Sequence, residues 1–219
     1  MREHHLSVPR TSRYFVLGEP GPAVREVWFV LHGYGQLAAR FLKAFSALDD
    51  GSRLVVAPEG LSRFYLDPAG RDKVGASWMT REDRLNEIAD YVRYLDAVST
   101  EVRGRLDSDT ARVHALGFSQ GTATACRWAA LGTAPVDRLV LWGGEVPPDL
   151  DLVAARERLA PLDLVLVAGS RDEFITPKVL ARDEERLRGA GIAYRVIRFE
   201  GGHEIDGGVL RQLTEASPG

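Results

Sequence analysis

Residues 112–132 read RVHALGFSQGTATACRWAALG, an apolar strand that runs directly into a helix rich in small residues. Ser119 stands at the junction, between Gly117 and Gly121. A tight turn from strand to helix brings two backbones close together, and glycines remove the Cβ atoms that would collide. The turn presents the serine hydroxyl above the sheet and places the Gln120 N–H at the helix start, where it can stabilise negative charge. The G-x-S-x-G pattern in this context predicts a nucleophilic serine, and the alternative is a plain turn with a serine N-cap.

Strand-like and helix-like segments alternate along the rest of the chain. Alternation of this kind predicts one α/β domain, residues 1–219, with a doubly wound, mostly parallel sheet and helices on both faces. Short antiparallel strands are expected at residues 4–9 and 12–17, and a long irregular stretch at residues 61–79. The remaining strands are expected within 25–33, 53–60, 112–118, 138–144, 162–170 and 193–201, and the helices within 36–49, from an N-cap at Thr80 to about 98, and within 120–131, 149–159, 177–189 and 208–216.

The composition is that of a soluble globular protein, with 45% hydrophobic residues and a net charge of −3. This charge gives no reason to expect nucleic acid as a partner, and no apolar run is long enough for stable insertion into a membrane. The N-terminus lacks the apolar core of a signal peptide, so we predict a cytoplasmic location. The single cysteine, Cys126, lies in the helix after Ser119 and is expected to pack in the core.

A nucleophilic serine needs a base and an acid that orients the base. In a sheet of this type the chain order is serine, then acid, then histidine. His203 is the one histidine after Ser119, and it lies in a glycine-rich loop after the last strand. The acid is expected after the preceding strand, where Asp172 fits the turn better than Glu173, with Glu145 as an alternative one strand earlier.

The loop after the first long strand should supply a second N–H for the oxyanion. It reads LHGYGQ, where Gly33 and Gly35 let the backbone approach a substrate and the Tyr34 N–H is the expected donor. His32 is expected to organise this loop through local hydrogen bonds. No histidine or cysteine cluster has the spacing of metal ligands, so we predict neither a metal nor an organic cofactor.

Four segments, VLHGYGQ (30–36), GFSQG (117–121), GSRDEFITP (169–177) and GGH (201–203), resemble the phospholipase/carboxylesterase family of α/β-hydrolases, which includes the acyl-protein thioesterases. The resemblance implies the α/β-hydrolase fold, with Ser119 as nucleophile, Asp172 as orienting acid and His203 as base. It also implies an oxyanion hole formed by the backbone N–H groups of Tyr34 and Gln120.

The sequence departs from the family's pattern around the expected substrate pocket. Family members commonly carry leucine where Tyr34 stands, and the segment 58–78 also differs from the thioesterases. GASWMT (75–80) occupies the place of the family's substrate loop, so Trp78 and Met79 are expected to line the acyl pocket. The stretch 61–79 is either a lid over the pocket or a structural loop packed on the sheet. The predicted substrate-binding residues are Gly33, Tyr34, Trp78, Met79 and Phe174.

These residues predict a serine hydrolase that cleaves small-molecule carboxylic esters or thioesters through an acyl-enzyme. A serine peptidase or an acyltransferase on the same fold is the alternative, because the same acyl-enzyme can be captured by water, an alcohol or an amine. A non-catalytic ligand-binding protein is a third hypothesis, because proteins that share one fold can have unrelated functions. The oligomeric state is left open, with a homodimer among the options.

Overall fold

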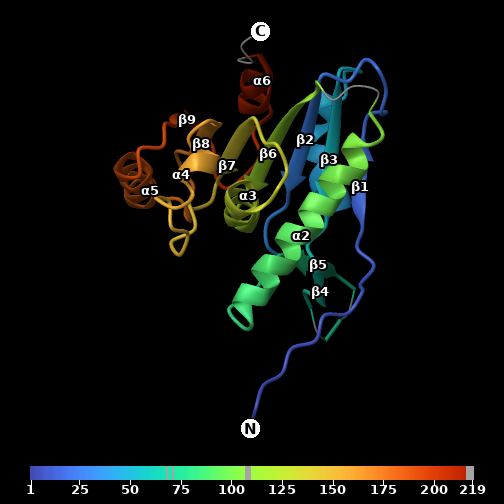
Figure 1. Ribbon diagram of the computed structural model, residues 1–219. Helices are drawn as coiled ribbons and strands as arrows, with labels where there is room; N and C mark the ends of the chain where they lie inside the picture. The colour runs from blue at the N-terminus through green and yellow to red at the C-terminus, as the bar shows by residue number, and fades with distance from the viewer. Residues whose placement is uncertain (68, 71, 107–109, 216–219) are drawn as a thin grey trace.

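The computed structural model describes residues 1–67, 69–70, 72–106 and 110–215. At its centre lies a seven-stranded sheet of order β1-β3-β2-β6-β7-β8-β9, in which every neighbouring pair is parallel except β1 and β3 (Figure 1). This is the mostly parallel sheet that the alternating segments predict. The strands are β1 (Tyr14–Leu17), β2 (Glu26–Leu31), β3 (Arg53–Pro58), β6 (Arg112–Phe118), β7 (Arg138–Trp142), β8 (Asp163–Gly169) and β9 (Arg195–Phe199).

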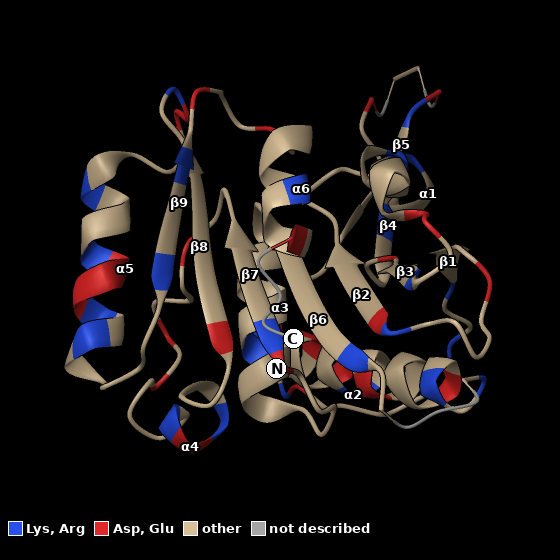
Figure 2. Cartoon of the chain, turned by 90° about the horizontal axis from the view of Figure 1, so that it is seen from above, with Lys and Arg blue, Asp and Glu red and all other residues tan. Residues whose placement is uncertain are grey.

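Helices cover both faces of the sheet (Figure 2). The six residues of β2 are all buried, and their side chains alternate between two cores: Phe29 and Leu31 face one core, Trp28 and Val30 the other. Burial on both faces explains why the strands are continuous apolar runs. One core is closed by α2 (Arg84–Arg103), α3 (Gln120–Leu131), α4 (Arg156–Leu159) and α5 (Pro177–Gly189), and the other by α1 (Ala38–Phe41), the 3-10 helix η1 (Leu42–Leu48) and α6 (Gly207–Glu215).

Of the two predicted N-terminal strands, the one within 12–17 is confirmed as β1, and the one at 4–9 is wrong. Residues 4–9 form no strand, and Tyr14–Leu17 pairs instead with β3, where Tyr14 lies opposite Pro58. The apolar side chains of residues 4–9 are not buried against the rest of the protein: Leu6 is 87% exposed and Val8 is 70% exposed. Without a buried face, alternation of residue types does not hold a segment in a sheet.

Three predicted helices differ in the structure. The helix after Thr80 begins at Arg84, because Asp83 has the left-handed φ of 47° and cannot continue a helix. The segment 36–49 divides into α1 and η1, whose buried residues Leu42, Phe45 and Leu48 recur every third residue, the period of a 3-10 helix. In the segment 149–159, only Arg156–Leu159 is helical.

The stretch 61–79 is not irregular: it contains a hairpin of β4 (Ser62–Tyr65) and β5 (Val74–Ser77). Two hydrogen bonds join β5 to the loop after β2, from the Gly35 N–H to the Ala76 oxygen (2.9 Å) and from the Ala76 N–H to the Gln36 oxygen (3.2 Å). A Cβ atom on Gly75 would lie 2.5 Å from the Gly35 oxygen, so only glycine allows this approach. The hairpin is therefore packed directly on the loop predicted to supply an oxyanion donor.

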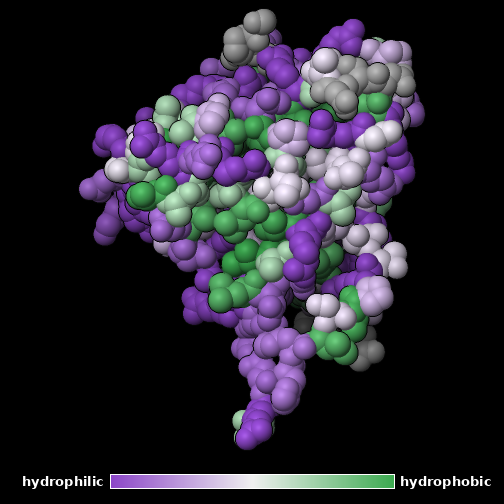
Figure 3. All heavy atoms as spheres, in the orientation of Figure 1, coloured by the Kyte–Doolittle hydropathy of each residue, from purple (hydrophilic) through white to green (hydrophobic). Residues whose placement is uncertain are grey.

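The face that carries α2 and α3 shows clustered hydrophobic residues among hydrophilic ones (Figure 3). Exposed apolar residues of the molecule include Leu85, Leu131 and Val153. Among the described residues, no helix combines the length and the apolar character needed to cross a bilayer.

Candidate active site

Ser119 occupies a strained turn between β6 and α3. Its φ of 55° and ψ of −118° lie in a region that non-glycine residues rarely adopt. A Cβ atom on Gly117 would overlap the Gly121 carbonyl, and one on Gly121 would overlap the Leu31 carbonyl. The two glycines therefore permit the sharp turn that the G-x-S-x-G pattern predicts.

His203 and Asp172 form a hydrogen-bonded pair beside this turn. The loops after β9 and β8 bring His203 Nδ1 to 2.9 Å from Asp172 Oδ2. Asp172 Oδ1 accepts hydrogen bonds from the N–H groups of Phe174 (2.8 Å) and Ile175 (3.0 Å). Burial raises the pKa of Asp172, but the hydrogen bond from His203 and those from the backbone outweigh burial and hold this pKa below its usual value. Asp172 is therefore a carboxylate that orients the imidazole.

The other candidate acids lie elsewhere. Glu173 is exposed, and Glu145 forms an ion pair with Arg182 at 2.7 Å. Neither carboxylate is hydrogen-bonded to His203 within the described chain. Of the acids considered from the sequence, the structure brings Asp172 to the histidine.

Gly143 and Gly144, which follow β7, connect Ser119 with the His203–Asp172 pair. A Cβ atom on Gly143 would lie 3.3 Å from both Asp172 Oδ2 and His203 Nδ1, and one on Gly144 would overlap the Ser119 carbonyl oxygen. The Phe118 ring, next to Ser119, lies 4.8 Å from the His203 ring. Among the described residues no hydrogen bond joins the Ser119 hydroxyl to His203.

The loop after β2 lies against Ser119. A Cβ atom on Gly33 would lie 3.1 Å from Ser119 Cβ. Gln36 Oε1 accepts the Gly33 N–H at 2.8 Å and closes the loop. In the described residues, the N–H groups of Tyr34 and Gln120 have no protein acceptor. These two N–H groups are therefore available as donors, and an oxyanion hole needs donors of this kind.

No protein-family model matches the sequence, and the curated proteins yield no match either. Solved structures do match. Acyl-protein thioesterase 2 of Zea mays superposes with a TM-score of 0.72 and 16% identity over 94% of this chain and 97% of that one. Esterase PE8 gives 0.71 and 19% over 94% and 97%, and a Bacillus cereus carboxylesterase gives 0.68 and 15% over 93% and 92%.

The chain has the α/β-hydrolase fold. The fold prediction is thus confirmed. In this fold the residues after the strands share one edge of the sheet, where ligands bind. Ser119, Asp172 and His203 follow β6, β8 and β9 at that edge.

His32 organises the loop after β2 of the α/β-hydrolase fold, as expected. Its ring is fully buried, Nδ1 lies 2.8 Å from the Gly33 oxygen, and Nε2 accepts the Gly60 N–H at 2.9 Å. Burial lowers the pKa of His32. A neutral ring that accepts at Nε2 carries its proton at Nδ1, so it donates to Gly33 and joins the loops after β2 and β3.

Trp78 and Met79 support the site and do not line the groove beside His203. Trp78 is 2% exposed, stacks on His32 at 5.0 Å, and donates from Nε1 to the His32 oxygen at 2.8 Å. The half-buried Met79 has its sulfur 3.4 Å from Arg127 Nη1.

The Gln120 side chain is a feature that the sequence analysis missed. Its Oε1 accepts the Trp78 N–H at 3.1 Å, and its Nε2 donates to the Met79 oxygen at 2.9 Å. Gln120 thereby fixes the segment after β5 to the start of the helix that follows the serine. The signal available in the sequence was the long amide side chain directly after Ser119, in place of a small residue.

A groove of about 450 Å³ opens beside His203, between the α1–η1 segment and the loop after β9. Phe41, Phe118 and Gly35 contribute to its lining. Phe174 lies outside this set; the residue is 67% exposed, and its ring lies 4.6 Å from the His203 ring. Tyr34 is also exposed and packs on Phe64 at 5.2 Å. The groove has the size of a small-molecule site in an enzyme.

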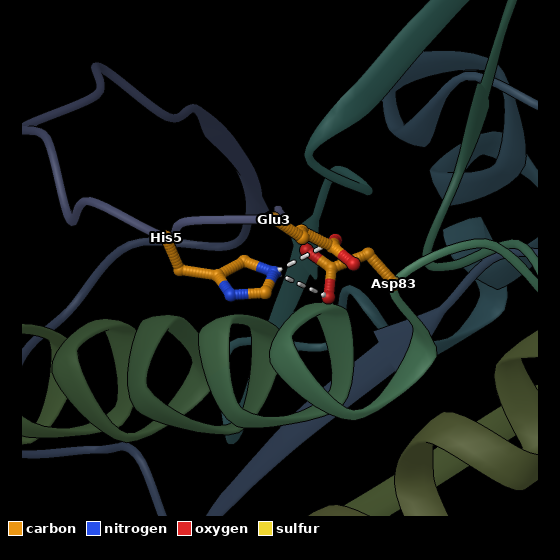
Figure 4. Close-up of side chains that lie close together, drawn as sticks. All are labelled: Glu3, His5 and Asp83. Atoms are coloured by element: carbon orange, nitrogen blue, oxygen red, sulfur yellow. Dashed lines mark ion pairs between the residues drawn. The ribbon is translucent and has the colours of Figure 1, made fainter. Parts of the chain in front are cut away.

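Glu3, His5 and Asp83 form a separate cluster, whose ligand-type atoms lie within 4.8 Å of one another (Figure 4). All three residues are exposed, and His5 Nε2 lies 3.2 Å from Glu3 Oε1 and 3.3 Å from Asp83 Oδ1. The cluster is explained by contacts between the histidine ring and two carboxylates at the surface. It shares no residue with the groove or with the Ser119 site.

Cys126 is fully buried in the helix after Ser119, as predicted. Burial raises the pKa of its thiol to about 12. A thiol of this kind is inert at neutral pH, since the thiolate is the nucleophile.

Proposed function

We propose that this chain is a serine hydrolase that cleaves carboxylic ester or thioester bonds through an acyl-enzyme. Ser119 is the nucleophile, His203 the base and Asp172 the acid that orients it. The observation that carries the proposal is the 2.9 Å hydrogen bond between His203 and Asp172, held by Gly143 and Gly144 next to the strained turn of Ser119. A strained nucleophile beside an oriented imidazole is typical of active sites.

The reaction follows from these positions. His203 Nδ1–H donates to Asp172, which leaves Nε2 to accept the proton of Ser119 as its Oγ attacks the substrate carbonyl. The N–H groups of Tyr34 and Gln120 bind the oxyanion. His203 then passes the proton to the leaving alcohol or thiol, and the C–O or C–S bond breaks. Water, deprotonated by the same imidazole, attacks the acyl carbon and releases the acid and free Ser119.

The names of the structural neighbours support ester and thioester substrates, because they are an esterase, a carboxylesterase and an acyl-protein thioesterase. We therefore propose a small-molecule ester or thioester as the substrate. Rates on p-nitrophenyl esters of increasing chain length, compared with aminoacyl anilides, separate a hydrolase of esters from a peptidase. Product analysis with an added alcohol identifies an acyltransferase.

The experiment that tests the proposal is labelling by a fluorophosphonate, followed by intact-mass measurement and peptide mapping. We expect one adduct on Ser119 in the native protein and none in Ser119→Ala, whose kcat on a p-nitrophenyl ester should fall by about 10⁴- to 10⁶-fold. Ser170→Ala is the matched control, because Ser170 also follows a strand but hydrogen-bonds to Glu200. Equal labelling of native and Ser119→Ala protein refutes the assignment.

A further inference from the structure

The groove beside His203 has a wall formed by one face of the α1–η1 segment. Leu37, Arg40, Phe41 and Ala44 line it, at intervals of three, one and three residues, the spacing of one helical face. Lys43 belongs to the same segment but does not line the groove. Of the two cations, only Arg40 therefore faces a bound substrate.

Aromatic rings connect His203 with this wall. The His203 ring lies 4.8 Å from that of Phe118, and the Phe118 ring lies 5.9 Å from that of Phe41, the neighbour of Arg40 in the chain. A substrate whose reacting carbonyl lies near His203 would therefore lay its next atoms on an apolar surface, and its far end would lie near the guanidinium of Arg40. Such a surface suits a short apolar spacer.

The charges at the groove are few. Arg40 is exposed and forms no ion pair or hydrogen bond with its side chain among the described residues. Glu204 also lines the groove, but its Oε1 accepts the Gly202 N–H at 3.2 Å and so caps its own loop. The guanidinium of Arg40 is therefore a positive charge at the groove that no acceptor among the described residues engages.

From this arrangement we infer that the groove selects substrates with a carboxylate, which pairs with Arg40 while an apolar spacer lies on Phe118 and Phe41. The inference rests on the proposed function, because it names the substrate class of that site. A guanidinium binds a carboxylate through two parallel hydrogen bonds, which gives both affinity and direction. Arg40 is thus a specificity-determining residue and has no part in bond cleavage.

The test compares kcat/KM for matched esters that differ only in a terminal charge. One series carries it on the acyl side, with p-nitrophenyl monoesters of dicarboxylic acids against acyl chains that end in a methyl ester. The other carries it on the alcohol side, with acetate esters of ω-hydroxy acids against their methyl esters. In at least one series, native enzyme should prefer the carboxylate, and Arg40→Met should reduce the carboxylate-to-neutral ratio of kcat/KM by roughly 10-fold.

Two controls make the result specific. Lys43→Met, which removes a cation from the same segment outside the groove, should leave the ratio unchanged. Arg40→Lys should keep part of the preference, and added salt should weaken it in native enzyme because exposed charges are screened.

The inference is overturned when neither series shows an Arg40-dependent preference, or when Lys43→Met lowers the ratio as much as Arg40→Met. Faster turnover of ω-amino esters than of ω-carboxy esters would also overturn it and assign the recognition to Glu204. These outcomes differ from failure of the proposed function, in which neutral esters are not turned over and Ser119 is not labelled by fluorophosphonate.

Discussion

His203 Nδ1 lies 2.9 Å from Asp172 Oδ2, and Gly143 packs against both side chains. With φ of 58°, Gly143 adopts a backbone conformation that L residues rarely reach, and a Cβ atom there would press on the pair. The turn after β7 thus shapes the space in which an imidazole and a carboxylate meet. This arrangement ties three loops of the sheet edge to one another.

Asp172→Asn should lower kcat on a p-nitrophenyl ester by about 10⁴-fold. An amide at this position still accepts the backbone N–H groups of Phe174 and Ile175, but it cannot hold the imidazole tautomer with its free nitrogen toward Ser119. Steady-state kinetics measure the effect, and circular dichroism checks the fold. Glu173→Gln is the matched control, because Glu173 is exposed and should tolerate the change. Comparable losses in both variants would contradict the role of Asp172.

The depressed pKa of Asp172 predicts a loss of stability in acid. A carboxylate whose pKa is lower in the folded than in the unfolded state stabilises the protein above the unfolded value, about 4. As the pH falls from there through the folded pKa, this contribution disappears. Urea unfolding at pH 7 and in steps below pH 4 should show a steeper decline for the native protein than for Asp172→Asn. Parallel curves would show that other carboxylates control acid unfolding.

Much of the fold could be predicted from the sequence because strands buried on both faces leave continuous apolar runs, as in β2 and β8. The turn at Ser119 was predictable because its sterics require glycine at two fixed positions, Gly117 and Gly121. The order of Ser119, Asp172 and His203 then identified the residues that the loops bring together.

Other features depend on contacts distant in sequence and left no local pattern. Trp78 was expected in the acyl pocket, but its side chain is buried in the core, where the indole N–H donates to the His32 oxygen. The hairpin β4–β5 depends on the backbone of Gly35, more than 20 residues upstream. The catalytic roles of the site residues and the cytoplasmic location stay predictions.

The glycines around Ser119 should resist substitution. Gly121→Ala places a Cβ atom on the Leu31 carbonyl, which belongs to a central strand and cannot move away easily. We expect the free energy of unfolding to fall by about 2–3 kcal/mol, as in overpacked cores. Urea denaturation measures the change.

Gly189→Ala is the matched control for that experiment. Gly189 is the last residue of α5, and no atom lies within 4 Å of the position of an added Cβ. Alanine there should leave stability unchanged or increase it by about 0.5–1 kcal/mol, since glycine costs helix stability. A similar loss in both variants would show that the crowding at Gly121 is not the cause.

Gln120→Ala should separate the role of the Gln120 side chain in holding the segment after β5 from the proposed role of its backbone N–H. The substitution keeps the backbone N–H of residue 120 but removes the acceptor of the Trp78 N–H and one of the two donors to the Met79 oxygen, which keeps the Ser77 hydroxyl. Polar groups left without partners in a packed region cost about 1–3 kcal/mol, so the free energy of unfolding should fall by that amount. Gln212→Ala, an exposed glutamine on α6, should change stability by less than about 0.5 kcal/mol. Because the proposed oxyanion donor is retained, labelling of Ser119 by fluorophosphonate should persist in Gln120→Ala, more slowly than in native protein. Unchanged stability and labelling rate would mean that the Gln120 amide does not hold the segment after β5 in solution.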